Sequence, residues 1–202
     1  MERTNLGKED CTMDFVMNPQ VKSLKLARNG HLSNECLKKF ASACPRLQVL
    51  DVSHCSAITE EGLAEVSKKC CEIRHLVVNQ CDGMKNLGME SSLCKWEVLC
   101  AQRLGINDEA LAVIGKRCCG LLHLDLEGCM NVTMRGVKEV VQNCRGLREI
   151  NLKSCDNVNV DIVAWMVFTR PSLRKITPPP GFVPSESQRE LFLHHGCLVC
   201  NG

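Results

Sequence analysis

Hydrophobic and polar residues alternate in a pattern that returns along most of the chain. Counted from Cys44, apolar residues fall at offsets 3, 6 and 8, a cysteine at offset 11 and another apolar residue at offset 14. The same offsets recur from Cys118 and from Cys144, and several neighbouring copies start 26 residues apart. A period of this size is typical of solenoids, in which each unit is too small to bury its own apolar face.

Each copy has the pattern of a short strand followed by a helix. In the copy from Cys44, three apolar residues surround positions expected to be exposed, as in a strand with one buried face: Leu47, Leu50 and Val52. Thr59 is a suitable N-cap for the helix that follows, whose inner face carries Leu63 and Val66. The repeating unit is therefore predicted to be strand, turn and helix.

Stacking such units predicts an α/β solenoid. Successive strands lie side by side and parallel, on the concave face of a curved right-handed array, and the wider helices lie on the convex face. We expect a short N-terminal segment at residues 1–17, six to seven repeats over 18–177 with an irregular stretch at 82–95, and a capping tail at 178–202. Pro178–Pro180 cannot donate ladder hydrogen bonds, so regular stacking is expected to end there.

The cysteine positions and the net charge limit the expected cellular compartment and the classes of partner. Half of the sixteen cysteines occupy the lead position or offset 11 of a repeat, which predicts packed thiols in a reducing compartment. The formal net charge is only +2 with both signs interspersed, and Tyr is absent, which argues against nucleic-acid and polybasic membrane partners. There is no secretory signal core and no run long enough to span a membrane, so we expect a cytoplasmic or nuclear location.

The motif that runs from Cys44 to Leu63 resembles the cysteine-containing subtype of leucine-rich repeat found in F-box proteins, and the copies from Cys118 and Cys144 follow it closely. The resemblance covers residues 18–177 and implies a leucine-rich repeat solenoid. In that family, the repeats recognise substrates of SCF-type cullin-RING ubiquitin ligases, and a separate F-box docks on the ligase adaptor. The residues before the first repeat contain no counterpart of the F-box. The chain is then expected to be either the repeat half of a longer protein or a relative that lacks the F-box.

The concave face is the predicted recognition surface, because residues between the buried strand positions point out of the sheet. Offsets 5, 7, 9 and 10 supply mainly polar candidates for binding a protein or peptide: Lys25, Arg28, Asp51, Ser53, His54, His75, Asn79, Gln80, Gln102, Arg103, His123, Asp125, Glu127, Glu149, Asn151 and Lys153. Asp51, Asp125 and Lys153 are hypothesised to contact the partner. The alternative is a solvated face without a ligand. The stretch Asp82–Lys95 is a second candidate, or else a degenerate helix that has become a loop.

Other chemistry is less supported by the pattern. Cys197 and Cys200 form a CxxC beside two histidines, but a structural zinc site usually needs four donors and no second pair follows, so neither a metal nor a cofactor is expected. Thiols beside the lead cysteines have basic neighbours, but no base is placed in sequence to activate them, so the chain is not predicted to be an enzyme. The favoured function is substrate recognition for ubiquitin-dependent degradation. The alternatives are a stand-alone repeat scaffold or inhibitor, and a thiol-based redox sensor.

Overall fold

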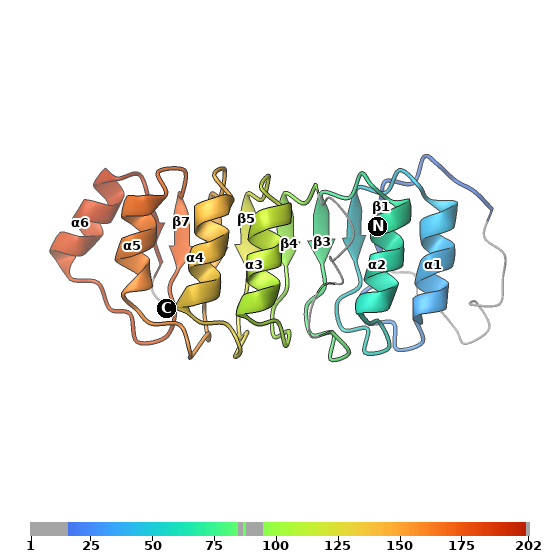
Figure 1. The fold of residues 1–202 in the computed structure, drawn as a ribbon, viewed down its shortest axis with the longest axis horizontal. Helices are drawn as coiled ribbons and strands as arrows, with labels where there is room; N and C mark the ends of the chain where they lie inside the picture. Colours follow the sequence, from blue (N-terminus) through green and yellow to red (C-terminus); the bar gives the residue numbers. More distant parts are fainter. Residues whose placement is uncertain (1–15, 85–86, 88–94, 201–202) are drawn as a thin grey trace.

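A computed structural model describes residues 16–84, 87 and 95–200. Short strands alternate with helices along most of this part of the chain (Figure 1). The strands are β1 (Ser23–Lys25), β2 (Val49–Asp51), β3 (His75–Val77), β4 (Val98–Cys100), β5 (His123–Asp125), β6 (Glu149–Asn151), β7 (Lys175–Thr177) and β8 (Leu198–Val199). The helices are α1 (Asn34–Ala43), α2 (Glu60–Lys69), α3 (Asp108–Arg117), α4 (Met134–Asn143), α5 (Ile162–Thr169) and α6 (Glu186–His194).

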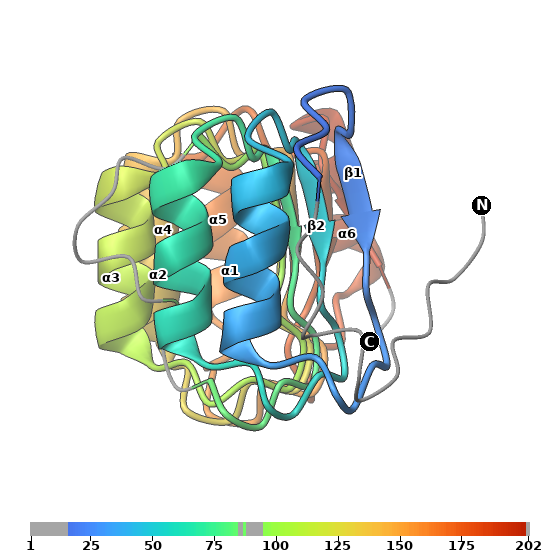
Figure 2. The ribbon, with the colours of Figure 1, turned by 90° about the vertical axis from the view of Figure 1, so that its right-hand side faces the viewer.

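All the strands form one parallel sheet in chain order, from β1 to β8. The sheet is one layer and α1 to α5 form a second layer along one of its faces (Figure 2). The predicted α/β solenoid is therefore confirmed. We call the side of the sheet that the helices leave uncovered the sheet face; it corresponds to the predicted concave surface.

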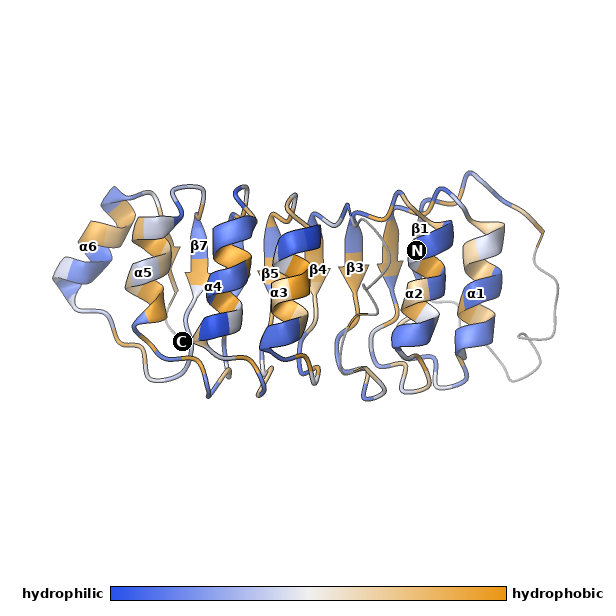
Figure 3. Ribbon diagram, viewed as in Figure 1, coloured by the Kyte–Doolittle hydropathy of each residue, from blue (hydrophilic) through white to orange (hydrophobic). Residues whose placement is uncertain are grey.

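Repeat-equivalent residues pair with one another across the sheet, which is why the apolar offsets build a continuous core. Leu50 pairs with Leu76, and Leu76 pairs with Leu99. These side chains are at most 2% exposed and point toward the helix layer's apolar face. Figure 3 shows hydrophobic strips on helices whose other faces are polar. Stacking thus supplies the burial that a single unit lacks.

The cysteines at offset 11 each bind the preceding repeat. The Sγ atom of Cys55 lies 3.2 Å from the carbonyl oxygen of Leu26. The Sγ atom of Cys81 lies at the same distance from the carbonyl oxygen of Val52. Both thiols are free and buried, as the sequence predicted. A small side chain with a weak S–H donor therefore fills the core and satisfies a carbonyl at the same time.

The lead cysteines are also buried, with one exception to the predicted chemistry. Cys44, Cys70 and Cys144 are free thiols, and Cys144 donates to the carbonyl oxygen of Cys118 at 3.3 Å. Cys118 is buried in the same column but is disulfide-bonded, so the prediction of a free thiol is wrong there. The repeat pattern identifies equivalent positions, but it does not show which of the equivalent cysteines the fold brings close enough to another sulfur to form a disulfide.

The sheet continues beyond the proline run, contrary to the expected end of regular stacking. β7 stops at Thr177 as predicted, and Ser185 begins α6 with a capping box in which Gln188 is the reciprocal partner. Gly196, at φ +74, then reverses the chain after α6, and β8 pairs in parallel with β7. The prolines interrupt one ladder locally, but the chain after them is long enough to return and cover the edge of β7.

None of the helices in the described ranges is long and apolar enough to cross a bilayer.

Candidate functional site

A groove of about 360 Å³ lies on the sheet face over β4 to β7. Four of its lining residues were predicted from the sequence: His123, Asp125, Glu149 and Asn151. Sequence reasoning missed four others that project from the same strands: Val98, Cys100, Lys175 and Thr177. Val98 and Cys100 are apolar and were not among the predicted binding residues, although they occupy the same outward offsets. Applying the offsets regardless of residue type would have found them.

Parallel pairing builds the groove from two columns of side chains. His123 pairs with Glu149, and Glu149 pairs with Lys175, so three titratable groups follow one another across adjacent strands. Asp125 and Asn151 pair in the neighbouring column. Adjacent strands in a sheet lie about 4.8 Å apart, so these columns present alternating chemistry at short intervals. A ligand that crosses the strands would meet apolar, acidic and basic groups in turn.

Asp125 is the most connected side chain of the groove. Its carboxylate accepts hydrogen bonds from Gln102 Nε2 at 2.7 Å, from Asn151 Nδ2 at 2.9 Å and from the backbone N–H of Glu127 at 3.1 Å. Asn151 Nδ2 also reaches Glu127 Oε2 at 3.3 Å. The structure therefore brings four of the predicted residues into one polar network. Within it, Asp125 organises its neighbours.

The column of His123, Glu149 and Lys175 makes fewer polar contacts within the protein. His123 Nδ1 lies 3.6 Å from Glu149 Oε2, and both side chains keep more than a third of their surface exposed. Lys175 is exposed and makes no ion pair with any residue of the described part. Glu149 and Lys175 are thus the charged groups of the groove that a partner can engage without first dismantling a network.

Cys100 lines the groove as a protonated thiol. Burial is the main cause that raises its pKa to about 11, and the negative charges of Asp125 and Asp51 add to the effect. Since the thiolate is the reactive form of cysteine, this side chain presents an apolar, unreactive surface near neutral pH.

The remaining predicted residues lie outside the groove, on the strands or in the turns that directly follow them. Their exposure divides them: Lys25, Arg28, His54, His75, Arg103 and Lys153 are exposed, whereas Asp51, Asn79, Gln80, Gln102 and Glu127 are half-buried. Ser53 was predicted to be exposed, but it is buried, with only 6% of its surface exposed. Its N–H donates to Asp51 Oδ1, and its hydroxyl accepts from the N–H of Asn79, so the chain turns inward where a continuing strand would have pointed it outward.

Offset 10 also has a backbone role that the sequence analysis did not predict. The six copies from Asn18 to Cys144 place this residue in the left-handed region, with φ from +53° to +71°: Arg28, His54, Gln80, Arg103, Gly128 and Ser154. The N–H of His54 still donates to the carbonyl of Asn79 in the next repeat at 2.8 Å. The glycine at position 128 is the signal that could have revealed this turn, because the left-handed region favours glycine.

No group of three or more potential ligands among the described residues could hold a metal ion. Cys197, of the CxxC motif, is buried in the core, and burial raises its pKa to about 11, while Cys200 is half-buried. Both are free thiols. Most of the second candidate stretch, Asp82–Lys95, lies outside the described residues.

Comparison with known proteins finds likeness at the level of solved structures. No family model matches the chain, and no curated protein matches it. Among solved structures, it is similar to a chain of the crystal structure of the Rad7 and Elc1 complex in yeast, with 14% sequence identity and a TM-score of 0.45 over 84% of this chain and 67% of that one. We draw no argument about function from a likeness at this level, and the fold rests on the structure described above.

Proposed function

We propose that this chain is a protein-recognition module whose groove over β4 to β7 binds a polar segment of a partner protein. One observation carries the proposal: four neighbouring strands present apolar, acidic and basic side chains in fixed register around a groove of about 360 Å³. Interfaces combine apolar contact with a few well-placed polar groups, and the groove supplies both.

The chemistry of the groove favours binding over catalysis. Its thiol is held protonated, and its most connected carboxylate is engaged by three donors from the protein itself. A nucleophilic site would need an activated group next to a base that another residue orients. The raised pKa values of the buried thiols, to about 12 at Cys129 and Cys144, also count against a thiol-based sensor at these positions.

The finer proposal is that the bound partner is a substrate for ubiquitination. It rests on the resemblance of the repeat from Cys44 to Leu63 to the repeats of F-box proteins. Docking on a cullin-RING ligase adaptor would then come from an F-box or from another subunit. The alternative is a scaffold or inhibitor that binds the same kind of partner and has no ligase.

The test is a charge exchange in the groove. The double variant Glu149→Lys, Lys175→Glu keeps the net charge but inverts two exposed charges of the groove. As a matched control, Glu61→Lys, Lys69→Glu makes the same exchange on exposed positions of α2. Tagged proteins are expressed in cells, and co-purified proteins are quantified by mass spectrometry. We expect a defined set of partners to fall about tenfold with the groove variant and to stay with the control.

Two outcomes separate the levels of the proposal. If both variants retain the same partners at the same level, binding through the groove is wrong. If groove-dependent partners are found but cullin and RING subunits are not among the co-purified proteins, and the partners do not accumulate when this chain is depleted, the ligase role is wrong and the scaffold remains.

A further inference from the structure

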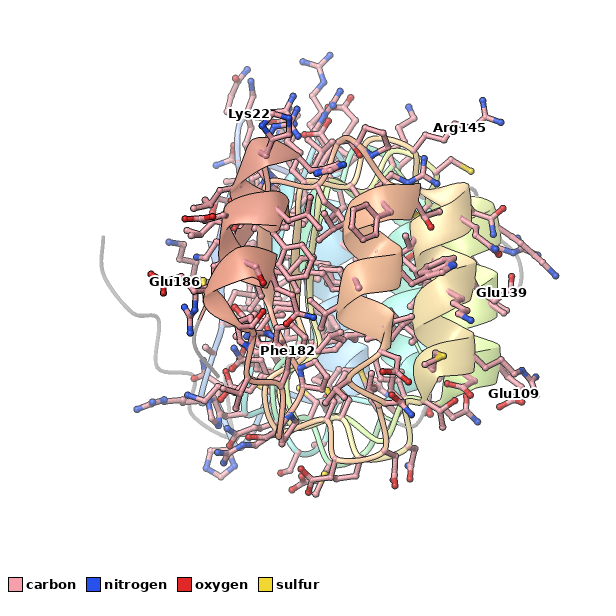
Figure 4. All side chains as sticks on the ribbon, turned by 90° about the vertical axis from the view of Figure 1, so that its left-hand side faces the viewer. Lys22, Glu109, Glu139, Arg145, Phe182 and Glu186 are labelled. Atoms are coloured by element: carbon pink, nitrogen blue, oxygen red, sulfur yellow. The ribbon has the colours of Figure 1, made fainter. Side chains whose placement is uncertain are left out.

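The fold gathers onto one edge of the solenoid basic residues that lie far apart in the sequence. The helices end and the strands begin along this edge, and the connecting turns there carry basic residues that we call the basic edge: Lys22, Arg46, Lys95, Arg145, Arg148 and Arg174. The opposite edge, where the helices begin, is mixed: it carries acidic residues such as Glu61, Glu109 and Asp161, and also Arg28, Arg103 and Lys153. In Figure 4, Lys22 and Arg145 lie at the upper edge and Glu109 lies toward the lower one.

Helix electrostatics explain only part of this gathering of basic residues. Basic residues in the last turn of a helix, such as Lys116 and Arg117 of α3, offset the partial negative charge of the helix end. The residues of the basic edge lie instead in the turns that follow the helices or lead into the strands. The dipole effect falls off within the last turn, so it does not account for a cation in most of these turns.

The basic edge is also unneutralised within the described part of the chain. All six side chains belong to exposed residues. None of them lies within ion-pair distance of a carboxylate of the described residues, whereas Arg74 and Lys68 on the same side pair with Glu97 and Glu65. Exposed cations left without counter-charges are available to a partner, and they cost no internal ion pair when they bind.

Repeat stacking sets the spacing of these cations. Adjacent strands lie about 4.8 Å apart, and the basic groups lie at the starts of β1, β2, β4, β6 and β7, so successive groups are one or two strand spacings apart. An extended polypeptide places side chains of one side about 7 Å apart. Long, flexible Lys and Arg side chains can match that interval, and Arg can bind a carboxylate through two parallel hydrogen bonds.

We propose that the basic edge docks an extended, acidic segment of a partner protein. Charge complementarity carries the proposal, and two details favour a peptide over a nucleic acid. Trp96, in the turn before β4, is only 4% exposed, so the described turns of this edge offer no exposed ring for base stacking. Glu72 and Glu97 also interrupt the row. A peptide with spaced acidic residues can avoid these carboxylates, but a continuous phosphate backbone cannot. None of the six residues of the basic edge lines the groove, so this inference does not depend on the proposed function.

The experiment measures binding of a short fluorescent peptide in which Glu alternates with Ser, by anisotropy with the full chain at low salt. The edge variant combines Lys22→Gln, Arg46→Gln and Arg148→Gln. The control variant combines Lys38→Gln, Arg135→Gln and Arg189→Gln, which removes the same charge from α1, α4 and α6. We expect the edge variant to bind the peptide about tenfold more weakly than the unchanged chain, because each exposed contact contributes modestly. The control is expected to change binding less than about twofold.

Several outcomes would overturn the proposal. Equal weakening by both variants would mean that only net charge matters. Unchanged binding in the edge variant, with circular dichroism showing an intact fold, would mean that the edge does not bind acidic peptides. A duplex DNA fragment that binds more tightly than the peptide, and loses this affinity in the edge variant, would assign the edge to nucleic acid. Self-association in analytical ultracentrifugation that only the edge variant abolishes would make a second copy the occupant.

Discussion

The Sγ atom of Cys155 lies 3.0 Å from the carbonyl oxygen of Leu126, one repeat earlier in the chain. The same carbonyl accepts the N–H of Cys129, so one oxygen joins two consecutive turns of the solenoid. Cys129 in turn places its own sulfur 3.1 Å from the carbonyl of Ala101. These S–H donors thus link consecutive repeats where the strands end. They lie on the buried side of the sheet whose other side carries the groove.

Replacing Cys155 with Ala should therefore destabilise the fold. The substitution removes a buried sulfur and its hydrogen bond, and we expect a loss of about 1–2 kcal/mol in the free energy of unfolding. Urea unfolding measures it. The control is Cys71→Ala, an exposed thiol outside the core, which is expected to change the free energy by less than about 0.5 kcal/mol. Equal losses in the two variants would contradict a structural role for the column.

Ser154→Gly should stabilise the protein. Ser154 has φ +55°, where a side chain costs about 1–2 kcal/mol, and glycine avoids most of that cost at the expense of some entropy in the unfolded chain. We expect a net gain of about 0.5–1 kcal/mol in thermal or urea unfolding. Ser56→Gly, at an exposed turn position of the second repeat without a positive φ, should give no gain. A gain at both positions would show that the backbone angle is not the cause.

Asp125→Ala should disturb the groove more than loss of its exposed charges does. The variant removes the acceptor of Gln102 Nε2 and of the N–H of Glu127, and leaves Asn151 Nδ2 only its longer bond to Glu127, so we expect a loss of about 1–2 kcal/mol in unfolding free energy. Glu149→Ala removes only an exposed pair with His123 and should cost less than about 0.5 kcal/mol. If the two variants unfold alike, Asp125 does not organise the network.

Stability should fall in alkaline solution because of the buried thiols. Burial raises the pKa of Cys129 and Cys144 from the ordinary 9.0 to about 12, so the folded state favours their protonated forms. This contribution is fully present below pH 9.0 and is lost as the pH rises through the folded-state pKa. The free energy of unfolding is expected to decrease from about pH 9 upward.

The double variant Cys129→Ala, Cys144→Ala tests the cause of that decrease. It should be less stable at neutral pH and show a shallower fall with rising pH than the unchanged chain. Cys71→Ser should keep the full fall, since Cys71 is exposed. An identical pH dependence in all three proteins would exclude Cys129 and Cys144 as its source.

Much of the fold could be predicted because each repeat contains the full pattern of one strand and one helix. Leu47, Leu50 and Val52 predict a strand, and Thr59 marks the start of a helix that the structure begins at Glu60. The recurrence of these offsets then determines the parallel order of the sheet, since each helix must bring the chain back to the same end. The expected exposed face of the strands also follows, and it includes His123, Asp125, Glu149 and Asn151 of the groove.

Only the tertiary structure decided which of these residues act together. The local pattern does not show that Ser53 turns inward onto Asp51 and Asn79, that offset 10 adopts a left-handed backbone, or that Val98 and Cys100 complete the groove. Nor does it show that Arg46 and Arg148 lie on one edge of the sheet, because residues about a hundred positions apart come to share an edge only through stacking. The apolar offsets alone determined the repeat, because burial acts in the same way on every copy. The polar sites depend on contacts between copies, which differ from one repeat to the next.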